Sequence, residues 1–283
     1  YVSDNNISSI DPLKYSEQMS ILYLSNNPNL GNNNSVISNM TALTKLDLST
    51  TGMTNIQSLQ NLIASLKPED EEEEMESYLL ELNLSNNAIG NITDIGSISS
   101  LEKLYISNIG IEDISELQTL TNLDTLNISG NQIKNIGALQ NLTDLRYLTM
   151  SDNIIEDITP ISSIALDSLD FSGNKVKDIS SLTKSYTTLK MDNNQISDIS
   201  NLENLSIQNF SVANQKISYV ISSNNARSIY AVTTDGLGNV IIPLPSIFKA
   251  SKQQGSKVYS ANQFDIANCN LSSDGKVTIC RLI

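Results

Sequence analysis

The sequence predicts a solenoid of stacked coils, each of which adds one short strand to a parallel sheet. Three observations lead to this fold class. An apolar pattern recurs mostly every 20 to 24 residues, two apolar residues in each copy alternate with polar ones, and an asparagine follows at a fixed distance. Residues 123–142 show the whole pattern, L-x-x-L-x-L-x-x-N-x-I-x-x-I-x-x-L-x-x-L. A period of this length is the signature of a leucine-rich repeat.

The strand of each copy is predicted around positions 3 to 7, where Leu123 is position 1 of its copy. Side chains alternate along a strand, so the apolar residues at positions 4 and 6 leave one face together. Positions 3, 5 and 7 then line the opposite, concave face. A single coil cannot bury its own apolar side, so stability is expected from stacking. Position 4 is apolar in nine copies: Leu22, Leu46, Leu82, Leu104, Leu126, Leu148, Leu169, Leu189 and Phe210.

Position 9 is mostly asparagine, which predicts a buried ladder of side chains. An inward asparagine can donate to and accept from the backbone of its own turn and of the neighbouring coil. Three copies lack it, and we expect irregular turns at Thr51, Ile109 and Gln215. The predicted structural ladder consists of Asn27, Asn87, Asn131, Asn153, Asn174 and Asn194.

The second half of each copy carries apolar residues at positions 11, 14, 17 and 20. This spacing predicts a returning side made of extended or 3₁₀-like turns, in a right-handed solenoid. Position 13 is Asn or Asp in most copies. Stacked acids could mark cation sites, but such side chains more simply bind the backbone of their own turn.

The composition argues against several classes of function. The net charge is -14 and the pI is about 4.3, whereas nucleic acids and anionic membranes attract positively charged proteins. No run of 18 or more apolar residues is present, so we expect no direct membrane insertion. The chain has no histidine, and the serines at position 7 have no general base beside them. We therefore expect no catalytic activity, no cofactor and no metal site.

Two domains are expected. The leucine-rich repeat domain spans residues 1–217, with about nine full coils and a partial first coil, because the chain begins inside a copy of the motif. From residue 218 the pattern changes to short runs of period two separated by turn signals, such as residues 235–239 and 272–275. Residues 218–283 are therefore predicted to form an antiparallel β module. Such a module would cap the exposed apolar end of the solenoid.

An acidic insertion at residues 65–78 interrupts the repeats and contains the run EDEEEEME. Lengthening a surface loop costs little, about 0.6 kcal/mol for each doubling of its length. The insertion is thus interpreted as a solvated loop or a short helical excursion on the outer side. The alternative is a loop that binds a cation or a basic partner, although a run of glutamates lacks the spacing of calcium loops.

The two cysteines, Cys269 and Cys280, both lie in the β module. If Asp274 and Gly275 form a two-residue hairpin turn, the cysteines stand directly opposite each other. They would then occupy a hydrogen-bonded pair with Cα atoms roughly 5.5 Å apart, within reach of a disulfide. A disulfide would indicate an oxidising compartment. A three-residue loop would shift the register and remove this match.

The residues at positions 3 and 5 vary between copies, which suits recognition on a rigid scaffold. The densest group of residue types that dominate protein interfaces consists of Lys103, Tyr105, Arg146 and Tyr147. With strands about 4.8 Å apart, Tyr105 and Tyr147 are expected roughly 10 Å apart. The alternative is that these tyrosines are ordinary exposed residues of a sheet. The predicted ligand-binding residues are Lys103, Tyr105, Arg146, Tyr147, Tyr23 and Lys190.

Several copies resemble the coils of the internalins, which are surface proteins of Gram-positive bacteria with 22-residue repeats. Residues 153–164, NIIEDITPISSI, and 194–205, NQISDISNLENL, resemble the internalin coil N-x-I-x-D-I-x-P-L-x-x-L. The segment ANQKI at residues 213–217 is similar to the internalin junction into an immunoglobulin-like domain. The resemblance implies an immunoglobulin-like fold for residues 218–283. It also implies export, surface display and, in some members, adhesion to a host receptor through the concave face.

The sequence therefore favours a monomeric extracellular or cell-surface module that binds a protein, for which a host or cell-surface receptor is one candidate. A second hypothesis is a structural spacer or cell-wall-associated scaffold without a tight ligand. A third is an intracellular leucine-rich repeat adaptor, which a disulfide between the two cysteines would contradict.

Overall fold

A computed structural model describes residues 1–65, 79–199, 201–202, 205–214, 239–241, 265–271 and 278–281. The chain divides into two compact units. The first contains Tyr1–Asn153 with Ser163–Ala165, and the second contains Ile154–Ser162 with Leu166–Ile283. Most of the acidic insertion, together with Gln215 and most of residues 218–283, lies outside the described residues.

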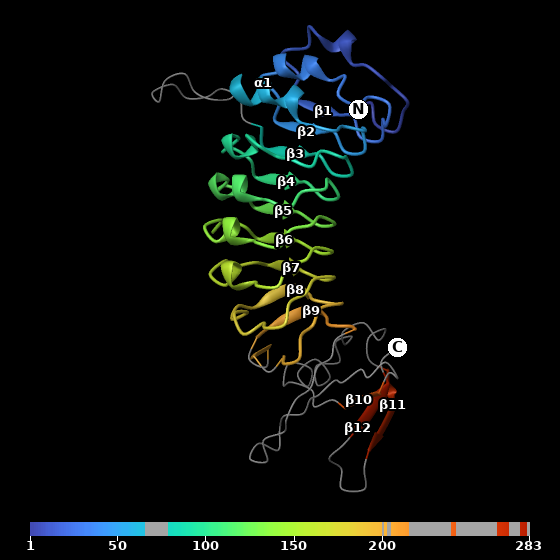
Figure 1. The fold of residues 1–283 in the computed structure, drawn as a ribbon, viewed down its shortest axis with the longest axis vertical. Helices are drawn as coiled ribbons and strands as arrows, with labels where there is room; N and C mark the ends of the chain where they lie inside the picture. Colours follow the sequence, from blue (N-terminus) through green and yellow to red (C-terminus); the bar gives the residue numbers. More distant parts are fainter. Residues whose placement is uncertain are drawn as a thin grey trace. The chain divides into compact units, whose positions relative to one another are not determined.

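The first unit contains a sheet of parallel three-residue strands (Figure 1). Each strand pairs with the next in the chain without a register shift, so the central leucines Leu22, Leu46 and Leu82 lie opposite one another. The strands are β1 (Ile21–Tyr23), β2 (Lys45–Asp47), β3 (Glu81–Asn83), β4 (Lys103–Tyr105), β5 (Thr125–Asn127) and β6 (Tyr147–Thr149).

The burial of each strand follows the predicted alternation. The central leucine is buried in every strand of this unit, whereas the first and third residues are half-buried or exposed. The residue at position 6, such as Ile106 or Ile128, is also buried. The stacked coils therefore share one continuous apolar core, as the spacing predicts.

The asparagine at position 9 joins each coil to the preceding one. The Nδ2 of Asn131 donates to the carbonyl oxygens of Ile128 in its own coil and Ile106 in the preceding coil, both at 2.9 Å. Its Oδ1 accepts from the backbone N–H groups of Ile109 and Ile111. The same type of bridge is made by Asn27, Asn87, Asn153 and Asn194, all of them buried. Asn174 is also buried and binds Phe171 and Ile155.

The copies without this asparagine have a different backbone conformation and a different hydrogen bond between coils. Where Thr51 and Ile109 occupy position 9, their carbonyl oxygens accept a hydrogen bond from a glycine N–H of another coil, at 2.7 Å in each case. The next residue, Gly52 or Gly110, adopts a left-handed conformation, with φ of 77° or 79°. In the described turns that have asparagine at position 9, the residue at position 10 never has a positive φ. The predicted irregularity at Thr51 and Ile109 is thus confirmed.

The returning side of the first unit consists mainly of 3₁₀ turns, as predicted. The exception is α1 (Gln57–Ser65), a true α-helix that replaces the 3₁₀ turn in the coil before the insertion. The five turns are η1 (Asp11–Leu13), η2 (Ser35–Asn39), η3 (Ile95–Ser97), η4 (Ser115–Thr119) and η5 (Gly137–Leu139).

The second unit begins with η6 (Thr159–Ile161) and continues with parallel strands of the same repeat. Leu189 lies opposite Leu169 on one side and Phe210 on the other, so the apolar ladder is in register here too. The later strands are longer because their first residues, Tyr186 and Ile207, are also buried. The strands are β7 (Ser168–Asp170), β8 (Tyr186–Lys190) and β9 (Ile207–Ser211).

Three antiparallel strands occur in the predicted β module: β10 (Asn239–Ile241), β11 (Asp265–Leu271) and β12 (Thr278–Arg281), in the order β10-β12-β11. Asn270 pairs with Ile279 and Leu271 with Thr278, which is the register predicted from a two-residue turn. The register shifts between Asp265 and Asn270, in the stretch that contains Cys269. The side chains of Cys269 and Cys280 lie outside the described part, so their disulfide stays a prediction.

The asparagine bridge leads to a first prediction. Asn131→Ala should lower the free energy of unfolding by about 2–4 kcal/mol, because several buried backbone groups lose their partners at once. Urea unfolding of the whole chain measures the change. The control is Asn135→Ala, which removes one exposed bond to the N–H of Gly137 and should cost about 1 kcal/mol or less. Equal losses in the two variants would contradict a special role for the buried bridge.

A second prediction concerns Asn34, which directly precedes η2 at the place where an isoleucine directly precedes η4, η5 and η6. Its side chain is fully buried, and neither its Nδ2 nor its Oδ1 has a hydrogen-bond partner in the described part of the chain. An unpaired buried polar group costs about 1–3 kcal/mol. Asn34→Ile should therefore raise the melting temperature, and Asn34→Ala tests the same point without added volume. If both variants melt below the parent chain, the asparagine stabilises the fold.

Candidate functional site

The solvent-facing side of the first unit's sheet is the candidate site, and we call it the strand face. It consists of the first and third residues of strands β1 to β6. The central residue of each strand is buried, so only these two side chains per strand face outward. They are Ile21, Tyr23, Lys45, Asp47, Glu81, Asn83, Lys103, Tyr105, Thr125, Asn127, Tyr147 and Thr149.

Half of the third-position residues bind their own turn. The Oδ1 of Asp47 accepts a hydrogen bond from the N–H of Ser49 at 2.9 Å. Asn83 and Asn127 accept in the same way from the N–H groups two residues further on, at 3.1 and 3.0 Å. These side chains close the strand-to-turn junction, so three of the six position-5 residues of this face serve the scaffold. The remaining third-position residues of this face are Tyr23, Tyr105 and Thr149.

A row of charged side chains crosses β2, β3 and β4. In the strand register Lys45 lies opposite Glu81, and Glu81 lies opposite Lys103. The Nζ of Lys45 is 3.0 Å from Oε2 of Glu81, and this hydrogen bond raises the pKa of Lys45 above its ordinary value. Lys103 forms no ion pair or hydrogen bond with any described residue. Glu81 is therefore paired with Lys45, and Lys103 on its other side has no counter-ion among the residues that the structure describes.

Tyr105 follows Lys103 at the third position of β4 and is half-buried. Its burial raises the pKa of the phenol above the usual value of 10.0, and the nearby carboxylate of Glu81 adds to this effect. The phenol therefore stays neutral at physiological pH and keeps its hydroxyl group as a hydrogen-bond donor.

Tyr147 is the first residue of β6 and has 44% of its surface exposed. The guanidinium carbon of the preceding residue, Arg146, lies 5.9 Å from the ring centroid. The register places Thr149, rather than Tyr147, in the row of Tyr105. The two tyrosines are thus offset along the strand as well as across it, and their Cα atoms are about 12 Å apart rather than the predicted 10 Å.

The β1 end of the strand face carries a second apolar group. Ile21 has 45% of its surface exposed. Tyr23, two residues further on, lies beside Tyr1 with ring centroids 5.0 Å apart. Tyr23 is three strands from Tyr105, so at about 4.8 Å per strand the two are roughly 14 Å apart. The repeat pattern places Ile21 at position 3 of the same face, but the predicted ligand-binding residues included Tyr23 and not Ile21.

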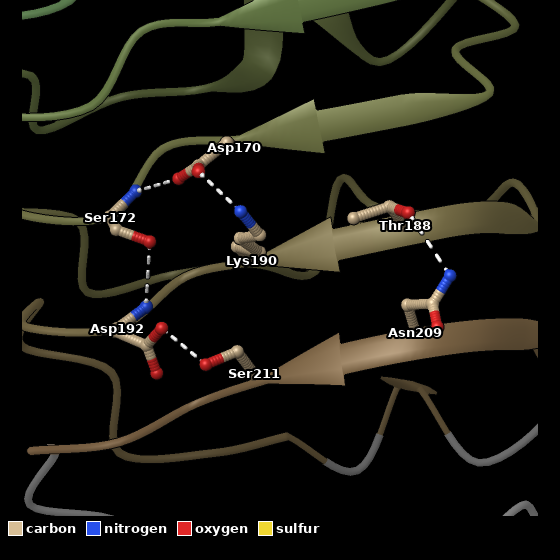
Figure 2. Close-up of polar contacts among 7 residues, drawn as sticks. All are labelled: Asp170, Ser172, Thr188, Lys190, Asp192, Asn209 and Ser211. Atoms are coloured by element: carbon tan, nitrogen blue, oxygen red, sulfur yellow. Dashed lines mark hydrogen bonds and ion pairs between the residues drawn. The ribbon is translucent and has the colours of Figure 1, made fainter. Parts of the chain in front are cut away.

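The second unit contains the remaining predicted binding residue, Lys190. Its Nζ is 3.5 Å from Oδ2 of Asp170, and the same carboxylate accepts from the N–H of Ser172 (Figure 2). Asp192 accepts from the hydroxyl of Ser211, and the Oγ of Ser172 accepts from the N–H of Asp192. Lys190 thus belongs to a local polar network within the second unit.

Several serines at position 7 have hydroxyl contacts with neighbouring coils, whereas the buried hydroxyl of Ser129 has no partner among the described residues. Ser85 accepts a hydrogen bond from the N–H of Ser107, and the hydroxyl of Ser25 donates to that of Ser3. Ser49 and Ser85 are buried. Because these hydroxyls lie at the crowded strand ends and bind neighbouring coils, they are scaffold groups.

The acids at position 13 bind local backbone. Asp113, Asp157 and Asp178 each accept from the N–H two residues further on, at 2.8 Å. This bond lowers the pKa of Asp178 below its ordinary value. Among the residues that the structure describes, no group of three or more histidine, cysteine, aspartate or glutamate side chains could hold a metal ion. No helix in the described ranges is long and apolar enough to cross a membrane.

Comparisons with known proteins agree with the repeat architecture. A family profile described as leucine rich repeats in two copies matches residues 121–163. No curated protein sequence gives a significant match. Internalin C2 from Listeria monocytogenes str. 4b F2365 is 29% identical, with a TM-score of 0.61 over 70% of this chain and 83% of its own. An internalin (inlF) from the same strain is 28% identical, with a TM-score of 0.62 over 77% of this chain and 68% of its own.

A more distant solved structure shares the fold alone. It is the plant peptide hormone receptor RGFR1 in complex with RGF2, which is 21% identical with a TM-score of 0.56. The match covers 76% of this chain and 35% of the receptor chain. The chain is thus a leucine-rich repeat protein similar to the internalins.

The capping role of Asp47 gives a third prediction. Asp47→Ala should lower the free energy of unfolding by about 1 kcal/mol, because the N–H of Ser49 loses its acceptor. Asp47→Asn should leave stability nearly unchanged, because asparagine makes the same bond in β3 and β5. Urea unfolding distinguishes the two variants. Equal destabilisation would mean that the charge of Asp47, rather than its acceptor oxygen, is what the fold uses.

Proposed function

We propose that the chain is an extracellular or cell-surface module that binds another protein through the strand face of its first unit. One observation carries this proposal. The strand face exposes Ile21 and Tyr147 and half-exposes Tyr105 and Lys103, while its Asp and Asn residues are committed to their own turns. Aromatic residues on a rigid sheet are typical anchors of protein interfaces.

The comparisons support the same class of function. The solved structures that are similar to this chain include two internalins and a receptor crystallised with RGF2. These folds present a parallel sheet whose outward side chains vary while the core repeats. Substitutions of these outward side chains can change the binding partner without altering the scaffold, which suits protein recognition.

The location and the remaining domain are parts of the same proposal. The internalin likeness supports display on the surface of a Gram-positive bacterium and a role in adhesion, with a host or cell-surface receptor as the partner. Residues 218–283 would form an immunoglobulin-like cap to the repeats of residues 1–217, and a disulfide between Cys269 and Cys280 would fit an oxidising compartment. The module would act as a monomer.

Binding through the strand face gives a fourth prediction. The probe is a phage-displayed library of random 12-residue peptides, selected against the whole chain. Replacing both Tyr105 and Tyr147 by alanine should weaken the selected peptides at least about tenfold, because the two anchors supply much of the buried contact area. Titration calorimetry measures the affinity, and thermal unfolding verifies that the variant keeps its fold.

The matched control is Tyr15→Ala, which removes a tyrosine that is 83% exposed and lies outside the strand face. This variant should bind the selected peptides as tightly as the parent chain does. If the double variant retains full affinity for every selected peptide, the strand face is not the binding surface. The chain would then be better explained as a spacer.

A further inference from the structure

Lys103 is the starting point for a more specific inference about the partner. It is half-buried on β4, where part of its side chain is withdrawn from water. No described residue forms an ion pair or hydrogen bond with it. Its one acidic neighbour in the strand row, Glu81, is held by Lys45 at 3.0 Å. A half-buried lysine that no described residue pairs with can accept a carboxylate from outside the chain.

The distribution of charge around the sheet points to the same ligand. In the described part of the first unit, Lys45, Lys103 and Arg146 lie on or directly beside the strands. The only other basic residues in that part are Lys14 and Lys134, whereas most of its acids lie away from the sheet. The strand face is therefore much less acidic than the rest of the unit. Asp47, Glu81, Glu102 and Asp124 also lie on or directly beside the strands, so three basic residues stand there against four acidic ones. An acidic group would therefore be repelled less at the sheet than elsewhere on the unit, and Lys103 is the basic residue there that no described residue holds.

The nearby side chains leave room for an incoming residue. In the first-position row, Lys103 lies opposite Thr125, and Thr125 lies opposite Tyr147. Thr125 is short, and its hydroxyl donates to Asp124 at 2.8 Å, so the threonine and that carboxylate are engaged with each other. The Cα atoms of Lys103 and Tyr147 are about 10 Å apart across this small residue. A side chain resting on Thr125 could reach both the ammonium group and the aromatic ring.

We propose that Lys103 forms an ion pair with an aspartate or glutamate of the bound protein, while an apolar neighbour of that acid packs on Tyr147. The inference rests on the proposed function, because it names the partner chemistry of the same strand face. The partner would present an acidic residue within two or three residues of an aromatic or aliphatic one. Lys45 does not compete for the acid, because Glu81 already neutralises it.

The test uses the peptides selected against the whole chain for the fourth prediction. Those that depend on Tyr105 and Tyr147 should be enriched in Asp or Glu next to an apolar residue. Lys103→Met, which keeps the apolar stem, should weaken them about fivefold, and Lys103→Glu at least about tenfold. The affinity of the parent chain should fall as sodium chloride rises, and this salt dependence should decrease in the Lys103→Met variant.

Reciprocal exchange provides the sharpest evidence. A peptide whose acid is changed to lysine should lose affinity for the parent chain and regain it with the Lys103→Glu variant. The matched control is Lys134→Glu, which makes the same charge reversal away from the strand face and should change these affinities less than about twofold.

Two results would overturn the inference and can be told apart. In the first, peptides that depend on the two tyrosines bind both Lys103 variants as tightly as they bind the parent chain. This result would exclude a role for Lys103 and leave the proposed function in place. A selection in which no peptide depends on the two tyrosines would reject the proposed function and this inference together.

Discussion

The whole structure depends on how a buried turn satisfies its backbone hydrogen bonds. The chain turns after each strand, and this turn packs against the turns of the neighbouring coils. Several of its N–H and C=O groups therefore lose contact with water. The position-9 asparagine supplies a donor and an acceptor at this point. For example, the single side chain of Asn131 binds the backbone of Ile106, Ile111 and Ile128. Since each bridge joins one coil to another, it sets the stacking distance and the register together.

The two described copies that lack asparagine, of the three in the sequence, show that the constraint is the hydrogen bond rather than the residue type. At Thr51 and Ile109 the peptide carbonyl makes the inter-coil contact, and a left-handed glycine follows it. Glycine is the residue that adopts this conformation without steric cost. The core and the sheet register continue through both coils, with Leu46 and Leu104 in line with their neighbours.

The same register decides which surface residues can take part in recognition. Capping by Asp47, Asn83 and Asn127 leaves only some third-position side chains available, and the pair between Lys45 and Glu81 occupies two of the first-position ones. Apart from Thr125 and Thr149, the groups that remain are aromatic, aliphatic or cationic. A surface of this composition, on a fold shared with internalins at 28–29% identity, is suited to binding a protein.

The sequence by itself determined the repeat, the buried position-4 residue of each repeat strand, and the asparagine ladder, because a regular spacing repeats the same local physics in each coil. It also predicted Tyr105, Tyr147 and Lys103 as outward-facing residues. Only the tertiary structure decided that Glu81 pairs with Lys45, that no described residue pairs with Lys103, and that the two tyrosines lie on a diagonal. It also decided that α1 replaces a 3₁₀ turn and that Asp47 caps its own turn, two residues away. The ion pair and the diagonal depend on how strands of different coils align, as for Lys45 and Glu81, and a local pattern does not specify which of several possible partners a side chain contacts.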